Sequence, residues 1–225
     1  MSEFKYFTFP VTFLPVCFED IKRACNQMAD YSIYAHSLKL ELGTELERIK
    51  SSANYHNVSL GNAKHTLDNG KKHFSSLPDK LPMTSINILT VFQFRDEYKT
   101  EFEIACFVAF AAIRSMLWKR KYLKINDSAL LSRMAGLSGL NFTPYQVPEH
   151  LKKYTKRYHR DKLLNELAEN WNLTTYARYT RGYYVSSSMD YETLGFEVEK
   201  SRLNRKQNQL KKEANARILA RLKPP

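Results

Sequence analysis

The order of local patterns in residues 127–188 constrains the fold more than any other feature of the sequence. Residues 128–135 predict a short amphipathic helix, because leucine and methionine recur there at helical spacing. Gly136 opens a turn, and residues 149–170 predict a longer helix that is rich in lysine and arginine. Two short strands follow, so the segment predicts a helix, a turn, a basic helix and a β-hairpin in that order.

The hairpin is predicted over residues 173–180 and 183–188, with Arg181 and Gly182 between the two strands. Glycine adopts positive φ angles without steric cost, as tight reversals require, so Gly182 favours a turn at this point. Polar and apolar side chains alternate along the first strand, which is typical of a strand with one face in solvent.

The predicted helix of residues 149–170 carries five basic side chains at spacings of three and four, which places them on one broad face. They are Lys152, Lys153, Lys156, Arg157 and Arg160. Arginine can read guanine through two parallel hydrogen bonds, whereas lysine mostly neutralises phosphate. We therefore expect the two arginines to contact bases or nearby phosphates, and the three lysines to raise affinity through counterion release. Tyr154 and Tyr158 lie on the opposite face and are expected in the core, with stacking on bases as the alternative.

This order of elements resembles the winged helix-turn-helix superfamily of DNA-binding proteins over residues 101–188. The resemblance implies that the second helix lies in the major groove while the first braces it across the backbone. It also implies that Arg178 and Arg181 at the hairpin contact DNA, with Tyr183 beside them. In general character the sequence is similar to regulator and replication proteins of bacterial mobile elements and phages, although it carries no diagnostic initiator motif.

The connection between the two predicted helices departs from the family pattern. It covers residues 138–148 and holds several turn formers, whereas a helix-turn-helix has a turn of only a few residues. Either the second helix begins earlier, near Pro144, or an insertion lengthens the turn.

The positive charge of the chain is concentrated in its last third. The net charge is +12, residues 1–100 hold 12 Lys and Arg against 11 Asp and Glu, and residues 150–225 hold 17 against 8. A basic face on one part of a protein is typical of a polyanion binder, so we expect double-stranded DNA as the partner. Two alternatives stay open. The protein could bind RNA by stacking of its tyrosines, or be a structural or interaction component of a phage or replication assembly.

The remaining segments predict a mainly α protein. Only 7 glycines and 8 prolines occur, which favours helices over tight turns. Residues 1–83 predict an N-terminal helical module with an extended first segment, and residues 84–200 predict the winged helix-turn-helix domain with its small β-hairpin wing. Residues 201–225 predict a basic C-terminal helix that extends the DNA footprint or forms a homodimer. The N-terminal module would also serve self-association or binding of a protein partner.

Helix boundaries are predicted from local signals. Thr44 and Thr100 are each followed three residues later by glutamate, the capping-box pattern, and the second precedes the most apolar helix at residues 102–117. We expect a helix over residues 18–42 that ends at Gly43, and a helix that begins at Ser85.

We expect no enzymatic activity, no cofactor and no metal site. The six histidines show neither HxH nor HExxH spacing, and the sequence has no CxxC pair and no glycine-rich phosphate loop. Asp190, Glu197 and Glu199 leave a Mg²⁺-dependent nuclease as the least favoured alternative.

The cysteine content predicts a cytoplasmic protein. Cys17, Cys25 and Cys106 each lie in an apolar context, which predicts buried, reduced thiols. No secretory signal pattern opens the sequence, and the longest apolar run, residues 104–113, is too short to cross a bilayer. We therefore expect neither secretion nor membrane association.

Overall fold

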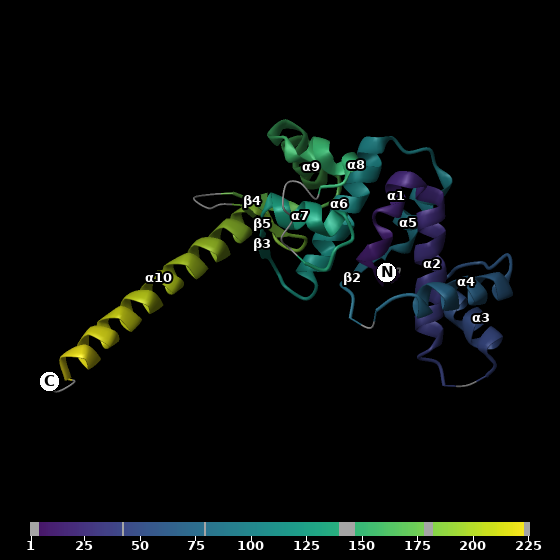
Figure 1. The fold of residues 1–225 in the computed structure, drawn as a ribbon, viewed down its shortest axis with the longest axis horizontal. Helices are drawn as coiled ribbons and strands as arrows, with labels where there is room; N and C mark the ends of the chain where they lie inside the picture. The colour runs from purple at the N-terminus through teal and green to yellow at the C-terminus, as the bar shows by residue number, and fades with distance from the viewer. Residues whose placement is uncertain (1–4, 42, 79, 140–146, 178–181, 223–225) are drawn as a thin grey trace.

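The computed structural model describes residues 5–222 apart from 42, 79, 140–146 and 178–181. The protein is mainly helical with two small antiparallel sheets, which confirms the predicted fold class at that level (Figure 1). The helices are α1 (Val16–Glu19), α2 (Ile21–Ser37), α3 (Glu45–Tyr55), α4 (Ala63–Ser75), α5 (Ile88–Asp96), α6 (Glu101–Leu117), α7 (Asp127–Met134), α8 (Glu149–Lys152), α9 (Arg157–Asn170) and α10 (Tyr191–Leu222). The strands are β1 (Tyr6–Pro10), β2 (Met83–Asn87), β3 (Leu123–Ile125), β4 (Thr174–Tyr176) and β5 (Tyr183–Ser186), and η1 (Val11–Phe13) and η3 (Lys153–Thr155) are 3-10 turns.

The first sheet joins the N-terminal segment to the middle of the chain. β1 pairs antiparallel with β2, so the predicted boundary between residues 83 and 84 falls within a strand. The helix predicted to begin at Ser85 begins instead at Ile88, where the Asn87 side chain accepts from the Leu89 N–H at 2.8 Å. Tertiary contact explains the difference, because Thr84 is buried and its hydroxyl donates to the Ala111 carbonyl of α6 at 2.7 Å.

Local capping signals predict several helix starts correctly. Both capping boxes, at Thr44 and Thr100, are present at the starts of α3 and α6. The helix expected over residues 18–42 is α2, which ends earlier, at Ser37. Leu38, directly after α2, is exposed, so its side chain gives a longer helix little stabilisation by packing.

The main hydrophobic core of the described residues extends from Phe7 to Val185 and includes most of α6. The apolar helix predicted at residues 102–117 is therefore confirmed, and Phe107 stacks on Phe94 of α5 at 4.7 Å between ring centroids. The three cysteines are free and buried in this core, as predicted.

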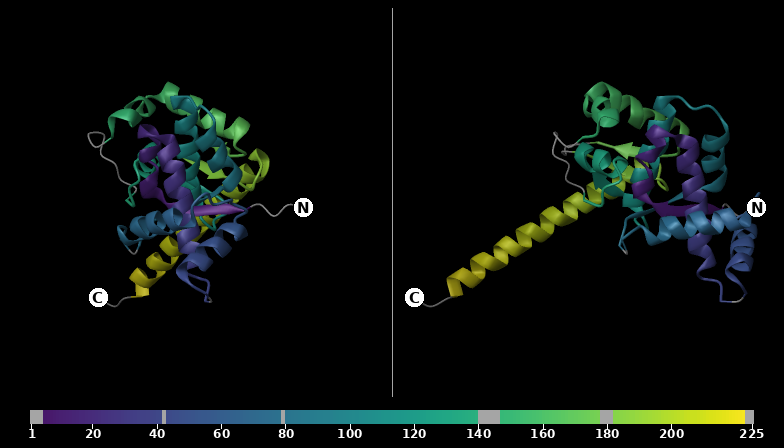
Figure 2. Two further views of the ribbon diagram at one scale, coloured as in Figure 1. Left: turned by 90° about the vertical axis from the view of Figure 1, so that its right-hand side faces the viewer. Right: turned by 45° about the vertical axis from the view of Figure 1, so that its right-hand side comes forward.

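The second sheet has the strand order β3-β5-β4, and all its pairs are antiparallel. Leu194 and Val198, in the first turns of α10, pack on Tyr176 and Tyr184 of this sheet. α10 then leaves the body, as both views in Figure 2 show. It runs without a break through the predicted boundary at residues 200 and 201. Among the described residues, no helix is both long and apolar enough to span a membrane.

Gly70 lies where α4 crosses α2, and alanine at this position is expected to destabilise the fold by about 2 kcal/mol. An added Cβ would lie 2.5 Å from the Tyr34 Cβ and 2.7 Å from the Asp30 carbonyl oxygen, so the two helices must separate. This cost outweighs the better helix propensity of alanine. Chemical denaturation measures the loss, with Gly61→Ala as control, because a Cβ at Gly61 meets nothing within 4 Å. Equal midpoints for both variants would contradict the expectation.

Candidate nucleic-acid interface

The candidate interface is formed by the elements α6, β3, α7, α9, β4 and β5, in that order along the chain. The Asn126 side chain caps α7 by accepting from the Ala129 N–H at 2.8 Å. Gly136 has φ +75°, which confirms the turn predicted directly after α7. The long connection predicted at residues 138–148 lies largely outside the described residues, which resume at Val147.

The basic helix predicted over residues 149–170 is not continuous, and this prediction is wrong. α8 ends at Lys152, a 3-10 turn follows, and Lys156 is extended with φ −78° and ψ 134° before α9 begins at Arg157. The Thr155 hydroxyl donates to the Lys152 carbonyl at 2.7 Å and competes with the helical bond that would continue α8. Tyr154, next to this break, is buried in the core, as the sequence predicted.

As a consequence, the five predicted basic residues do not share one helix face. Lys152 pairs with Glu149, and Lys153 pairs with Glu101 at the start of α6. Only Arg157 and Arg160 belong to α9 itself.

The two arginines of α9 occupy different environments. Arg160 pairs with Asp127 of α7 and with Asp161, and its side chain is only 20% exposed. Arg157 is 87% exposed, with its Nε 3.3 Å from an Asp161 oxygen. Arg160 therefore ties α9 to α7, whereas Arg157 remains available to a ligand.

The tyrosines also differ from the sequence-based prediction. Tyr183, predicted at the DNA surface, is 6% exposed, and burial raises the pKa of its hydroxyl, as does the nearby Asp127 carboxylate. Its side chain belongs to the main hydrophobic core, and its strand, β5, is the central strand of the sheet. Tyr158, predicted in the core, is 73% exposed beside Arg157 because the break after α8 rotates α9 relative to the expected face. Arg178 and Arg181 lie outside the described residues, while Gly182 has the positive φ that the sequence predicted, +89°.

The start of α9 differs from the other helix starts. In the described chain, every other helix of eight or more residues begins with a side chain that accepts a backbone N–H. These caps are Asp20, Thr44, Asn62, Asn87, Thr100, Asn126 and Asp190. Lys156 precedes α9 without such a bond, and the first turn of α9 holds no acidic residue. The exposed N–H groups of a helix start attract anions, and the basic side chains around this one add to that attraction.

The remainder of α9 is not basic. Over Arg157–Asn170, three Lys and Arg face three Asp and Glu. Lys162 lies over the ring of Phe102 at 4.6 Å and is directed toward α6. The positive charge that α9 offers is therefore concentrated at its first turn.

An open groove of about 440 Å³ lies between α9 and the β4–β5 hairpin. Its lining includes Asp127, Arg157, Arg160, Asp161, Leu164, Asn165, Thr175, Ala177, Gly182 and Tyr183. The countercharges Asp127 and Asp161 were not predicted from the sequence. The four-residue spacing of Arg157 and Asp161 was a visible signal for one of these pairs.

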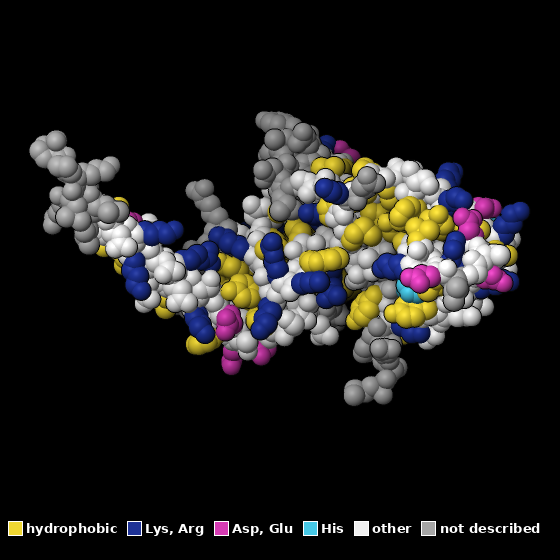
Figure 3. Space-filling view, turned by 90° about the horizontal axis from the view of Figure 1, so that it is seen from below, with side chains coloured by type: hydrophobic (Ala, Val, Ile, Leu, Met, Phe, Trp, Pro, Cys, Tyr) yellow, Lys and Arg dark blue, Asp and Glu magenta, His cyan; other side chains and the backbone are white. Residues whose placement is uncertain are grey.

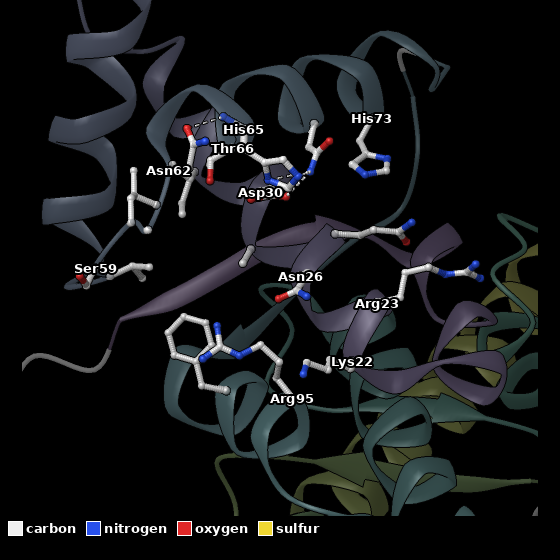
Figure 4. Close-up of a pocket in the computed structure, with 18 of the residues that line it drawn as sticks. Lys22, Arg23, Asn26, Asp30, Ser59, Asn62, His65, Thr66, His73 and Arg95 are labelled. Atoms are coloured by element: carbon white, nitrogen blue, oxygen red, sulfur yellow. Dashed lines mark hydrogen bonds between the residues drawn. The ribbon is translucent and has the colours of Figure 1, made fainter.

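A second, larger pocket of about 650 Å³ lies in the N-terminal half (Figure 4). Lys22 and Arg95 lie across it from Asp30, whose carboxylate accepts from the Asn69 amide at 3.2 Å. Burial raises the pKa of Asp30, while this hydrogen bond opposes the shift. Arg95 is engaged by Asp96 at 2.7 Å. The bond between Asp30 and Asn69 joins α2 to α4, whereas the pair of Arg95 and Asp96 lies within α5.

Two of the three carboxylates considered for a nuclease, Asp190 and Glu199, have other partners. Asp190 accepts from the Thr193 N–H at 2.8 Å at the start of α10, and Glu199 pairs with Arg202 at 2.9 Å. Within the described part of the chain, no three His, Cys, Asp or Glu side chains cluster in a way that could hold a metal ion.

No protein-family model matches the sequence, and neither a curated protein nor a solved structure is found to be similar to this chain.

Proposed function

We propose that residues 101–188 are a winged helix-turn-helix that binds double-stranded DNA without chemistry. The observation that carries the proposal is the order α6, β3, α7, α9, β4, β5, with the short α8 and η3 between α7 and α9, together with the strand order β3-β5-β4. In a winged helix, the strand between the first two helices pairs with the returning strand of the hairpin. Here Ile125 of β3 lies opposite Tyr183 of β5, in agreement with that arrangement.

The first turn of α9 is the proposed contact surface. The N-terminal residues of a recognition helix contact the edges of the bases in the major groove. The free backbone N–H groups at the N-terminus of a helix also bind phosphate. Lys156 and Arg157 supply exposed charge there, and Tyr158 supplies an exposed ring. Arg160 acts in this scheme as a positioning residue, since Asp127 and Asp161 hold it.

The uncapped start of α9 supports a functional role for this position. Replacing a capping side chain by a non-capping one costs about 1 kcal/mol, and the other long helices of the described chain all have one. Local rules of this kind are broken mainly where function requires it. Phosphate oxygens at the start of α9 would accept from the free N–H groups in place of a cap. Arg178 and Arg181 remain proposed contacts on the resemblance alone.

The experiment is duplex DNA binding by the full chain over a series of salt concentrations. We compare the wild type with Lys156→Gln/Arg157→Gln, and we use Lys39→Gln/Lys64→Gln as a control that removes two exposed charges from the N-terminal half. The logarithm of the binding constant falls linearly with the logarithm of the salt concentration, and each phosphate contact adds about 0.9 to the steepness of that slope. The slope of the double variant should therefore be shallower than that of the wild type by about 1.8. The control should match the wild type.

Three outcomes would contradict this function. Absence of duplex binding by the wild type at low salt would remove DNA as the partner. Equal slopes for the variant and its control would remove α9 as the contact surface. Preferential displacement of the duplex by single-stranded RNA would favour the RNA-binding alternative, in which the exposed Tyr158 stacks on a base.

A further inference from the structure

The part of α10 from Arg202 onward is the longest stretch of the described chain without tertiary contact. It is called the free part of α10 below. The helix has 32 residues, and Leu194 and Val198 anchor its first turns on the sheet. Every side chain from Arg202 to Arg217 is exposed. Figure 3 shows Lys and Arg side chains, in dark blue, along this part of the molecule.

The helical conformation of this free part has little stability by itself in water. Isolated helices gain little stability without packing, and like charges at spacings of three and four repel each other. Between residues 201 and 217 six side chains are basic and one is acidic, and Arg202, Arg205 and Lys206 have these spacings. A polyanion would remove this repulsion and stabilise the helix.

The basic side chains of the free part gather on one side of α10. At 100° per residue, five of the six fall within an arc of roughly 140°. They are Arg202, Arg205, Lys206, Lys212 and Arg217. Leu194 and Val198 lie on the same arc and pack on the sheet that contains the hairpin strands. The basic arc therefore continues, beyond the body, the side of α10 that faces the winged domain (Figure 1).

We propose that the basic arc of α10 is an arm that follows the phosphate backbone of DNA bound by α9 and the hairpin. The inference rests on the proposed function and extends its footprint. From Arg202 to Leu222 the helix spans roughly 30 Å at 1.5 Å per residue, the length of about nine base pairs at 3.4 Å each.

A second copy of the chain is a poorer occupant of this surface. Phe196, Leu203 and Leu210 recur every seven residues and are exposed, as in one row of a coiled-coil seam. The positions between them that would complete the seam are polar or charged. In two such parallel helices Arg217, which follows Leu210 by seven residues in the same row, would also meet its counterpart, and charge repulsion opposes that contact.

The test is duplex binding by the full chain with the five arginines and lysines of the arc changed to glutamine, a good helix former. The charge-matched control changes five exposed lysines of the N-terminal half, namely Lys39, Lys50, Lys64, Lys72 and Lys80. The slope of log affinity against log salt concentration should be shallower by up to about 4.5 in the arc variant. In the control, this slope should equal that of the wild type. In addition, lengthening the duplex by about ten base pairs should raise wild-type affinity and leave that of the arc variant unchanged.

The outcomes separate this inference from the proposed function. If the arc variant keeps the wild-type slope and length dependence while Lys156→Gln/Arg157→Gln binds more weakly, the arm is wrong and the winged-helix function stands. If the wild type does not bind the duplex at all, both fail. If Leu203→Gln/Leu210→Gln converts a dimer into a monomer in sedimentation and the arc variant binds as the wild type does, a second copy occupies the arm.

Discussion

Replacement of Gly182 by alanine is expected to destabilise the protein by about 3 kcal/mol or more and to abolish DNA binding. The residue has φ +89°, and an added Cβ would lie 2.3 Å from the carbonyl oxygen of Ile125. That carbonyl belongs to the backbone of β3, so the clash cannot be relieved by rotation of a side chain. Ile125 pairs with Tyr183, and the substitution therefore separates β3 from β5 beside the proposed DNA surface.

Urea denaturation and duplex binding measure the two effects of this substitution. Gly139→Ala is the matched control, because a Cβ at Gly139 meets nothing within 4 Å. The control should retain the wild-type midpoint and affinity. A wild-type midpoint for Gly182→Ala would mean that the sheet can shift at no cost, and it would contradict the expected effect.

Replacement of Lys156 by aspartate is expected to change stability and binding in opposite directions. The new carboxylate would cap α9 and interact favourably with its dipole, which stabilises the fold by about 1 kcal/mol. The same change removes a positive charge and adds a negative one where we propose that phosphate binds. DNA affinity should therefore fall by roughly tenfold or more, since 1.4 kcal/mol corresponds to a factor of ten.

Thermal unfolding and duplex binding test this pair of effects together. Lys64→Asp makes the same charge change in the first turn of α4, distant in sequence from α9, and should leave DNA affinity unchanged. Unaltered affinity in Lys156→Asp would remove the start of α9 from the interface. A lower melting temperature would contradict the capping argument.

Features of the structure that depend on near neighbours in sequence were predictable. The capping boxes at Thr44 and Thr100 each involve residues three apart, and both are formed. The positive φ of Gly182 follows from glycine chemistry alone. The position of α6 in the core was predictable from its apolar composition, because a helix with hydrophobic side chains on all its faces is stable only when it is buried.

Features that depend on distant contacts were not predictable in this way. β2 contains residues that local signals assign to a helix, yet Thr84 is held by the Ala111 carbonyl and paired with β1. The break before α9 separates Tyr154, which is buried in the core, from Tyr158, which is exposed on α9. The contact surface that we propose is smaller than the single basic face expected from the sequence, and it is centred on the first turn of α9.

The pairing of β1 with β2 has a consequence for synthesis of the protein. Thr8 and Ser85, whose hydroxyls lie 2.8 Å apart in this sheet, are separated by 77 positions in the chain. At ribosomal rates of about 5–20 residues per second, β1 waits roughly 4–15 s for its partner strand to emerge. During that interval Phe7 and Phe9, which are fully buried in the finished protein, lie on a strand that lacks its partner. Exposed apolar side chains and unpaired strand edges favour aggregation, so we expect the nascent N-terminal segment to be most prone to aggregation before β2 is made.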